Sequence, residues 1–179
     1  MAAAKDSAIK AVVSQVPLVS GMASIGMKSI SDIVRATMYG YIDYLKAALR
    51  LPPHYSPAIA QPGSFAAMNS KECYSGYLSI VPEGSDWENK MTSRGFIALA
   101  FYSPMKHAKK VKAPVLIIGG KNDSLIPISA VEKTAKKLPN GTLVELDCNH
   151  FEPYTGARFE QSIKIQVDFL EKHLLGRGT

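Results

Sequence analysis

Three segments of the chain carry the apolar patterning of β-strands. Residues 8–19 (AIKAVVSQVPLV) are rich in valine and stop near Pro17, residues 113–120 (APVLIIGG) form a continuous apolar run, and residues 141–148 (GTLVELDC) form a shorter one. Continuous apolar runs are typical of strands covered on both faces, because neither face then needs polar side chains. The pattern predicts a parallel sheet.

Helical patterns follow the second and third strands. After the second strand, Ser129 and Glu132 have capping-box spacing, and Pro139-Asn140-Gly141 stops the segment. The last segment repeats apolar residues at helical spacing and closes with Gly176. Its repeat consists of Phe159, Ile163, Val167, Leu170 and Leu174. The alternation of strands and helices predicts an α/β fold.

The middle of the chain has a different character. Apolar residues keep helical spacing from Ile30 to Leu49, and Pro52-Pro53 ends this helix. The repeat consists of Ile30, Val34, Met38, Tyr41, Ile42, Leu45 and Leu49. A second helix is predicted from Glu88 to Phe101, with Asp86 or Ser85 as its cap. An insertion of roughly 90 residues between strands far exceeds an ordinary connection. It predicts a helical lid over residues 21–107, between core segments 1–20 and 108–179.

Composition and charge narrow the classes of protein. The 179 residues are 46% hydrophobic and 20% charged, as in a globular domain, and the formal net charge is +6. Lysines cluster at 106–112 and 133–137 without interleaved aromatic residues, which favours a solvated surface over a nucleic-acid site. A nucleic-acid binder would instead show a steep salt dependence of binding. Two cysteines, no secretory leader and no long apolar run predict a cytoplasmic chain that does not enter a membrane.

The candidate chemistry lies in two loops that follow predicted strands. Asp123 comes directly after the strand ending in Gly119-Gly120, and His150 comes after the next strand along the chain. Because the carboxyl ends of parallel strands meet at one edge of a sheet, both side chains are expected at that edge. An acid beside a histidine fixes the imidazole tautomer and stabilises the imidazolium. This pair would supply two members of a nucleophilic triad.

These segments resemble the closing part of the α/β-hydrolase superfamily. The residues concerned are VKAPVLIIGGKNDSLIP (111–127), LPNGTLVELDCNHFEPYTG (138–156) and FEQSIKIQVDFLEKHLLG (159–176), with AAAKDSAIKAVVSQVPLVSG (2–21) similar to the sixth strand. The chain is most similar to esterase-like and dienelactone-hydrolase-like members, including fungal polyketide acyltransferases. The resemblance implies that Asp123 is the triad acid and His150 the general base, with no metal or organic cofactor.

The chain also departs from the family pattern. No G-x-S-x-G nucleophile elbow occurs, and the nearest segment, GMASIG (21–26), has Met22 where the elbow needs glycine. By comparison with the family, the first five strands and the oxyanion-hole donors would precede Met1, on the order of 100 residues at roughly 30 per βαβ unit. The chain alone is therefore predicted to lack an activated nucleophile.

Each candidate also has a simpler interpretation. In the simpler interpretation, Asp123 would cap the following helix or stabilise the turn before Pro127. His150 would be a surface histidine. For Cys148 the alternatives are a substitute nucleophile and a packed core residue, and its position at the end of a strand favours packing. His54, His107 and His173 lack zinc-ligand spacing. The lid aromatics line an acyl pocket or pack the lid; they are Tyr39, Tyr41, Tyr44, Tyr74, Tyr77 and Trp87.

Two functions remain in view. The first is a serine hydrolase acting on an ester or other acyl bond, of which this chain holds the C-terminal portion. The second is a non-catalytic shortened relative that works by binding. If the fifth strand is lacking, the backbone from Ala8 to Val16 is an exposed apolar edge, which favours a homodimer or a complex with an N-terminal half.

Overall fold

The computed structural model describes residues 1–176, which fold as two compact units. The first unit contains Met1–Ser20 and the described residues from Ser103 onward, and the second is Gly21–Tyr102. Among the helices of the described residues, none combines the length and the apolar character that crossing a bilayer requires.

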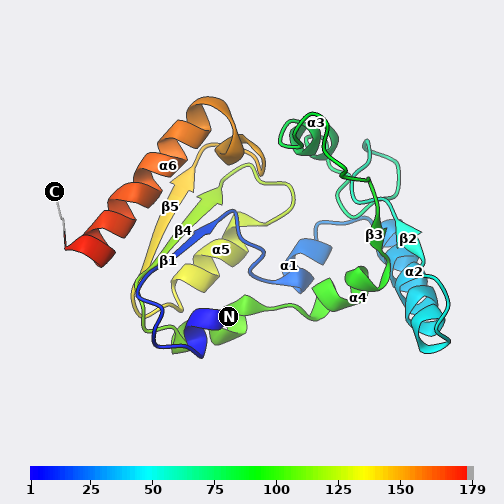
Figure 1. The fold of residues 1–179 in the computed structure, drawn as a ribbon, viewed down its shortest axis with the longest axis horizontal. Coiled ribbons are helices and arrows are strands. Elements are labelled where there is room, and N and C mark those ends of the chain that lie inside the picture. Colours follow the sequence, from blue (N-terminus) through cyan, green and yellow to red (C-terminus); the bar gives the residue numbers. More distant parts are fainter. Residues whose placement is uncertain (177–179) are drawn as a thin grey trace. The chain divides into compact units, whose positions relative to one another are not determined.

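The first unit is built on a three-stranded parallel sheet (Figure 1). Its strands are β1 (Val12–Gln15), β4 (Val115–Gly120) and β5 (Gly141–Leu146), in the order β1-β4-β5. Val12 pairs with Val115, which pairs with Gly141. Every residue of β4 is buried, as its continuous apolar run predicts for a central strand. The prediction of a parallel α/β sheet is confirmed.

Helices cover both faces of this sheet. Helix α6 (Gly156–Leu170) packs on the face that carries Leu116, Ile118 and Leu146, and contributes Phe169 to that core. Helix α5 (Ile128–Ala135) lies so close to the strand that a Cβ on Gly119 would meet Ile128 at 2.8 Å. Because side chains alternate along a strand, the two helices cover opposite faces.

Short helical turns complete the first unit. They are η1 (Ala2–Ala4), η2 (Pro104–Lys110), η3 (Glu152–Tyr154) and a π-helical turn, η4 (Glu171–Leu175), that extends α6. Gly176 ends the last turn in the left-handed conformation, with φ of 67°. The prediction that Gly176 closes this helix is confirmed.

The predicted capping box of Ser129 and Glu132 is wrong. Helix α5 begins at Ile128, directly after Pro127, and no side chain caps its N-terminus. Pro127 holds φ at −63°, which brings the chain into the helix before Ser129 is reached. Ser129 therefore lies inside the first turn and is exposed to solvent.

The apolar repeat of the last segment predicts the helix, but of its five residues only Leu170 packs against the core. Phe159, Ile163, Val167 and Leu174 are exposed, whereas Ser162 and Phe169 are buried and Ile165 and Leu170 pack against the core. The buried face is held to the sheet by Phe169, Ile165 and Leu170, which join the core, and by Ser162 Oγ, which donates to Oε1 of Gln15 on β1 over 2.6 Å.

The second unit contains four helices and a small antiparallel sheet within its described residues. They are α1 (Gly21–Ile25), α2 (Ile30–Ala48), β2 (Tyr55–Ser56), α3 (Cys73–Leu78), β3 (Met91–Thr92) and α4 (Arg94–Phe101). The long helix predicted from Ile30 is confirmed, and Ser29 Oγ caps it by accepting the backbone N–H of Asp32. Gly40 lets α2 approach α4, since a Cβ there would meet Ile97 at 2.6 Å.

The prediction that the second lid helix begins at Glu88 is wrong, because α4 begins at Arg94. Met91 and Thr92 instead pair with β2. The side chain of Asn89 accepts the N–H groups of Ala58 and Ile59 and donates to Ile59 O. These partners lie some 30 residues away along the chain, so local sequence signals do not reveal them.

Candidate active site

Asp123 lies in the loop that leaves β4 at the carboxyl edge of the sheet. One carboxylate oxygen, Oδ1, accepts the backbone N–H groups of Leu125 and Ile126, both at 2.8 Å. The side chain is only 1% exposed. Asp123 therefore stabilises the turn before Pro127, as one interpretation predicted, and this bonding leaves its second oxygen available.

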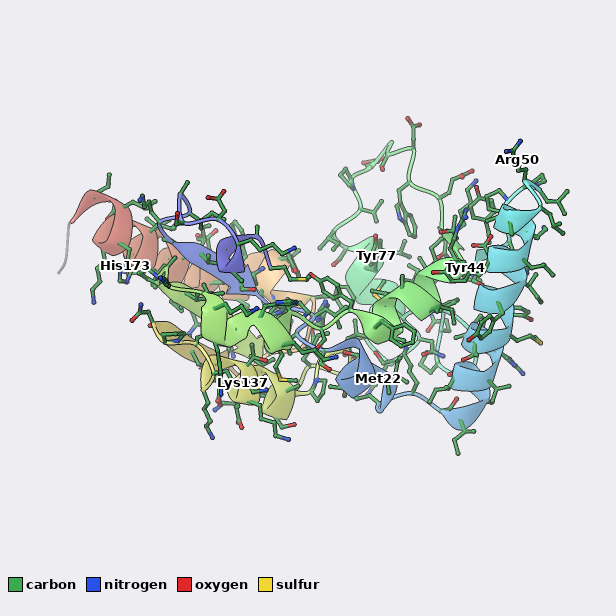
Figure 2. All side chains as sticks on the ribbon, turned by 90° about the horizontal axis from the view of Figure 1, so that it is seen from below. Met22, Tyr44, Arg50, Tyr77, Lys137 and His173 are labelled. Atoms are coloured by element: carbon green, nitrogen blue, oxygen red, sulfur yellow. The ribbon has the colours of Figure 1, made fainter. Side chains whose placement is uncertain are left out.

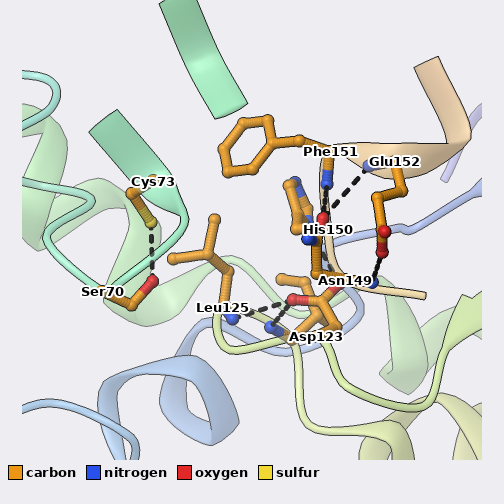
Figure 3. A network of polar contacts seen from close by, with 9 residues as sticks. Ser70, Cys73, Asp123, Leu125, Asn149, His150, Phe151 and Glu152 are labelled. Atoms are coloured by element: carbon orange, nitrogen blue, oxygen red, sulfur yellow. Dashed lines mark hydrogen bonds and ion pairs between the residues drawn. The ribbon is translucent and has the colours of Figure 1, made fainter. Parts of the chain in front are cut away.

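The second oxygen of Asp123 meets His150. Asp123 Oδ2 lies 2.8 Å from Nδ1 of His150, which is 17% exposed (Figure 3). A carboxylate accepts hydrogen bonds, so in the neutral imidazole Nδ1 carries the proton and Nε2 carries the lone pair. No residue of the described chain bonds Nε2. The structure thus brings together the two residues that the sequence paired.

Backbone hydrogen bonds hold the two loops at this separation. Lys121 N donates to Leu146 O over 2.9 Å, and Asn122 N donates to Cys148 O over 3.1 Å. The Asn122 side chain adds a bond to Asp147 at 2.8 Å. Gly120 permits the approach, because a Cβ there would lie 2.8 Å from Cys148 O. The acid and histidine loops are therefore joined directly by hydrogen bonds and close backbone contact.

The loop around His150 is shaped by Asn149 and Glu152, which the sequence interpretation missed. Asn149 Oδ1 accepts the N–H groups of Phe151 and Glu152, at 2.9 and 3.1 Å. In return, Glu152 Oε2 accepts the N–H of Asn149 at 2.6 Å (Figure 3). The available signal was the Asn-x-x-Glu spacing across the histidine, which is the spacing of a capping box.

Gln15 ties the histidine loop to the rest of the first unit. Its Nε2 donates to Pro153 O over 3.5 Å, and its Oε1 accepts from Ser162 and from Gln166. Gln15 also bonds Tyr154. Burial raises the pKa of Tyr154 and the negative charge of Asp123 adds to the rise, while the bond to Gln15 opposes it. No local sequence signal marks Gln15, because its partners are distant in the chain.

Cys148 is a packed core residue rather than a nucleophile. It is 1% exposed and belongs to the core with Leu116, Ile118 and Phe169. Burial, with the charge of Glu152 adding to it, raises the pKa of the Cys148 thiol to about 11. A reactive cysteine needs an accessible thiolate, so the packing interpretation is the one that the structure supports.

Ser24, in the segment closest to an elbow sequence, lies within helix α1 of the second unit. A nucleophile elbow places its serine on a sharp turn between a strand and a helix. The Ser24 hydroxyl is buried and has no partner in the described residues. Its position in a helix does not match an elbow.

The second unit contains another serine, histidine and aspartate in proximity. His54 Nδ1 lies 2.8 Å from Ser93 Oγ, which lies 2.7 Å from Ser56 Oγ. Asp43 accepts the backbone N–H groups of His54 and Arg94, each at 2.9 Å, and does not bond the imidazole. Ser93 is fully buried. This cluster is the polar core of the unit, not a second triad.

Some of the aromatic residues in the predicted lid pack within the second unit. Tyr39 stacks on His54 with 4.9 Å between ring centroids, and Tyr77 lies 5.0 Å from Trp87. Tyr41, Tyr44 and Tyr74 are exposed.

Among residues 1–176, no three histidine, cysteine or acidic side chains gather as a metal site would need.

Comparison with known proteins extends these observations. No family model matches the chain. The quorum-quenching protein AidA of Acinetobacter baumannii (strain MDR-ZJ06) is 31% identical over 172 residues, covering 95% of this chain and 56% of that protein. The chain thus spans little more than half the length of this relative.

Solved structures match nearly the whole chain. The structure of DcsB with its substrate analogue superposes with a TM-score of 0.77 at 19% identity, covering 98% of this chain and 60% of that one. The α/β hydrolase GrgF from Penicillium sp. sh18 gives 0.66 at 18%, covering 97% and 59%. A monoacylglycerol lipase of Paleococcus ferrophilus gives 0.66 at 16%, covering 96% and 62%.

The fold of these solved structures agrees with the strands and helices described above for this chain. The central strand β4, its parallel neighbours and the helices on the two faces occupy most of the first unit. At these identities the superpositions establish the fold rather than the reaction. The chain therefore has the α/β-hydrolase fold.

Proposed function

We propose that this chain supplies the acid and the general base of a serine hydrolase that acts on an ester or other acyl bond. The observation that carries the proposal is the 2.8 Å contact of the buried Asp123 carboxylate with Nδ1 of His150. That contact leaves Nε2 as the basic atom of the pair. The monoacylglycerol lipase match supports the choice of an acyl bond.

In the proposed reaction the nucleophile is a serine outside these 179 residues, because the sequence contains no G-x-S-x-G elbow. The serine oxygen forms a bond to the acyl carbon while its proton moves to Nε2 of His150. Asp123 stabilises the imidazolium without itself being protonated. The acyl–oxygen bond then breaks as Nε2 returns the proton to the leaving alkoxide, and water repeats the sequence to release the acid.

Three further properties belong to the proposal. The unit Gly21–Tyr102 serves as the lid that selects the acyl group, in keeping with its insertion between β1 and β4. The chemistry needs no metal or organic cofactor. The location is cytoplasmic, in keeping with two free, buried cysteines, Cys73 and Cys148.

The test uses the chain itself with two probes. Without an elbow serine, we expect no fluorophosphonate adduct by intact mass, and slow hydrolysis of p-nitrophenyl acetate that depends on His150 as a general base. His150→Ala should abolish the protein-dependent rate. The matched control is His173→Ala, an exposed histidine on η4, which should leave the rate unchanged.

The outcomes separate two parts of the proposal. An ester hydrolysis rate that is equal in the chain and in His150→Ala would remove the general-base role. A fluorophosphonate adduct that disappears in His150→Ala would instead place an activated nucleophile inside this chain.

A second candidate function is a non-catalytic binding or dimerising module that uses the strand from Ala8 to Val16. It is favoured by the position of β1 at one edge of the sheet. Val12 and Val16 donate their N–H groups to β4 residues or to Pro114 beside them. By alternation, the N–H groups of Val13 and Gln15 face the open edge, where a second copy or an N-terminal half would pair.

Val13→Pro tests this edge. Proline removes an N–H on the open side while the bonds to β4 remain. An edge-paired complex should dissociate in the variant, as measured by light scattering after size exclusion. An assembly that is the same size in Val13→Pro would exclude β1 as the contact.

A further inference from the structure

Helix α2 turns its apolar face to solvent. The exposed residues are Ile30, Val34, Met38, Tyr41, Ile42, Leu45 and Leu49, with exposed fractions from 39% to 81%. The opposite face, with Gly40 and the buried Asp43, packs against α4 and the chain before it. A helix on a globular domain ordinarily buries its apolar stripe. A continuous exposed stripe therefore indicates a contact surface.

The spacing of this stripe is that of a coiled-coil seam. Val34, Met38, Tyr41 and Leu45 are separated by four, three and four residues, which is the d-a-d-a pattern of a heptad. Extending the pattern by one position in each direction adds Ser31 at a and Ala48 at d. The seam thus has large residues in its middle and small residues at both ends.

The seam is self-complementary when two copies run antiparallel. About a two-fold axis between residues 39 and 40, Met38 faces Tyr41 of the second copy and Val34 faces Leu45. Each such layer joins an a position to a d position. Ser31 faces Ala48, and Ile30 at the edge of the seam faces Leu49. Large residues meet large ones and small residues meet small ones, as an isologous interface requires.

We propose that α2 docks antiparallel against α2 of a second copy of this chain. Each α2 also packs on its own α4, so the contact would resemble a four-helix bundle. Summed over the seven residues, the exposed fractions equal about four fully exposed side chains. At about 150 Å² for each such side chain, the stripe offers roughly 600 Å² of surface per copy. Twice that area reaches the lower end of stable protein interfaces, about 1,200 Å².

A lipid surface is the main competing occupant, because Arg35, Lys46 and Arg50 lie beside the stripe. Figure 2 shows Tyr44 on α2 and Arg50 just beyond the end of this helix. Membrane binding requires only an apolar face flanked by cations. It gives no reason for the match between the two halves of the helix about residues 39 and 40, whereas self-pairing does.

Cysteine crosslinking tests the antiparallel register. Both native cysteines are buried, so introduced surface cysteines report the contact. A mixture of Val34→Cys and Leu45→Cys chains should form a disulfide-linked dimer under mild oxidation. Val34→Cys alone should not, because its two copies would lie about 16 Å apart along the helix at 1.5 Å per residue. A crosslink of Val34→Cys to itself would indicate a parallel arrangement and overturn the proposal.

Mass measurement provides the second readout. Light scattering should give about 39 kDa for the chain, twice its 19.4 kDa, and the monomer mass for Tyr41→Asp. The matched control is Ile163→Asp, an exposed apolar residue on α6, which should remain dimeric. A monomeric native chain, or a dimer unaffected by Tyr41→Asp, would contradict the proposal. Binding of a monomeric chain to anionic vesicles that is lost in Tyr41→Asp would assign the face to lipid instead.

Discussion

The Asp123 carboxylate divides its two oxygens between two tasks: Oδ2 lies 2.8 Å from Nδ1 of His150, and Oδ1 accepts the N–H groups of Leu125 and Ile126. The backbone bonds hold the carboxylate with its second oxygen toward His150. A side chain held from both sides loses little further freedom when the imidazole becomes charged. This arrangement is the preorganised geometry that general-base catalysis requires.

Asp123→Asn should retain the fold and change the imidazole tautomer. The amide oxygen replaces Oδ1, but the amide nitrogen then donates toward Nδ1 and moves the ring proton to Nε2. Nitrogen NMR of the imidazole should show this exchange. In a protein that supplies the serine, kcat should fall about 10⁴-fold, as expected for the wrong tautomer. Unchanged imidazole nitrogen shifts would contradict the assigned contact.

Gly120→Ala should destabilise the first unit by about 1–3 kcal/mol, because its Cβ would lie 2.8 Å from Cys148 O. Urea unfolding measures the loss. Gly26→Ala is the control, since a Cβ there meets nothing closer than 3.4 Å, and its stability should change by less than about 1 kcal/mol. Equal stabilities for the two variants would show that the acid and histidine loops shift to accommodate the added methyl group at position 120.

Ser129→Ala should leave stability within about 0.5 kcal/mol of the native chain. Ser129 is exposed inside the first turn of α5 and caps nothing. A true N-cap serine would cost about 1 kcal/mol on removal. Thermal unfolding of the variant therefore distinguishes the observed helix start from the predicted capping box.

Asp43→Asn should weaken the second unit at neutral pH and flatten its response to acid. Burial alone would raise the pKa of Asp43, but the N–H groups of Arg94 and His54 and the Arg94 charge hold it below its usual value. The stabilisation is fully present above the unfolded pKa near 3.8 and is lost as pH falls through the folded pKa. Unfolding measured from about pH 6 down to about pH 2 should show a steeper loss of stability in the native chain than in Asp43→Asn.

Cys148 should resist alkylation until the chain unfolds. With a pKa of about 11, about one thiol in ten thousand is ionised at pH 7, and the side chain is buried in the core. A thiol assay with a coloured disulfide should detect Cys148 only in denaturant. Rapid labelling of Cys148 in the folded chain would reopen the case for a cysteine nucleophile.

Much of the first unit follows from sequence because its signals are local. The apolar run of β4 predicts a buried central strand, and strand order alone predicts that Asp123 and His150 reach one edge of the sheet. Periodicity also predicts α2 and its first residue, Ile30.

The sequence by itself therefore determined the parallel α/β core and the acid and histidine pair, since each depends on short-range patterns and on chain order. Tertiary structure decided which faces are buried. The face of α6 with Ser162 and Phe169 meets the sheet, while the face of α2 with Gly40 and Asp43 meets α4 and leaves the apolar stripe exposed. Asn89 bonds to Ala58 and Ile59, and a small sheet forms where the sequence predicted the start of a helix. These outcomes depend on partners tens of residues away, and local periodicity does not reveal such partners.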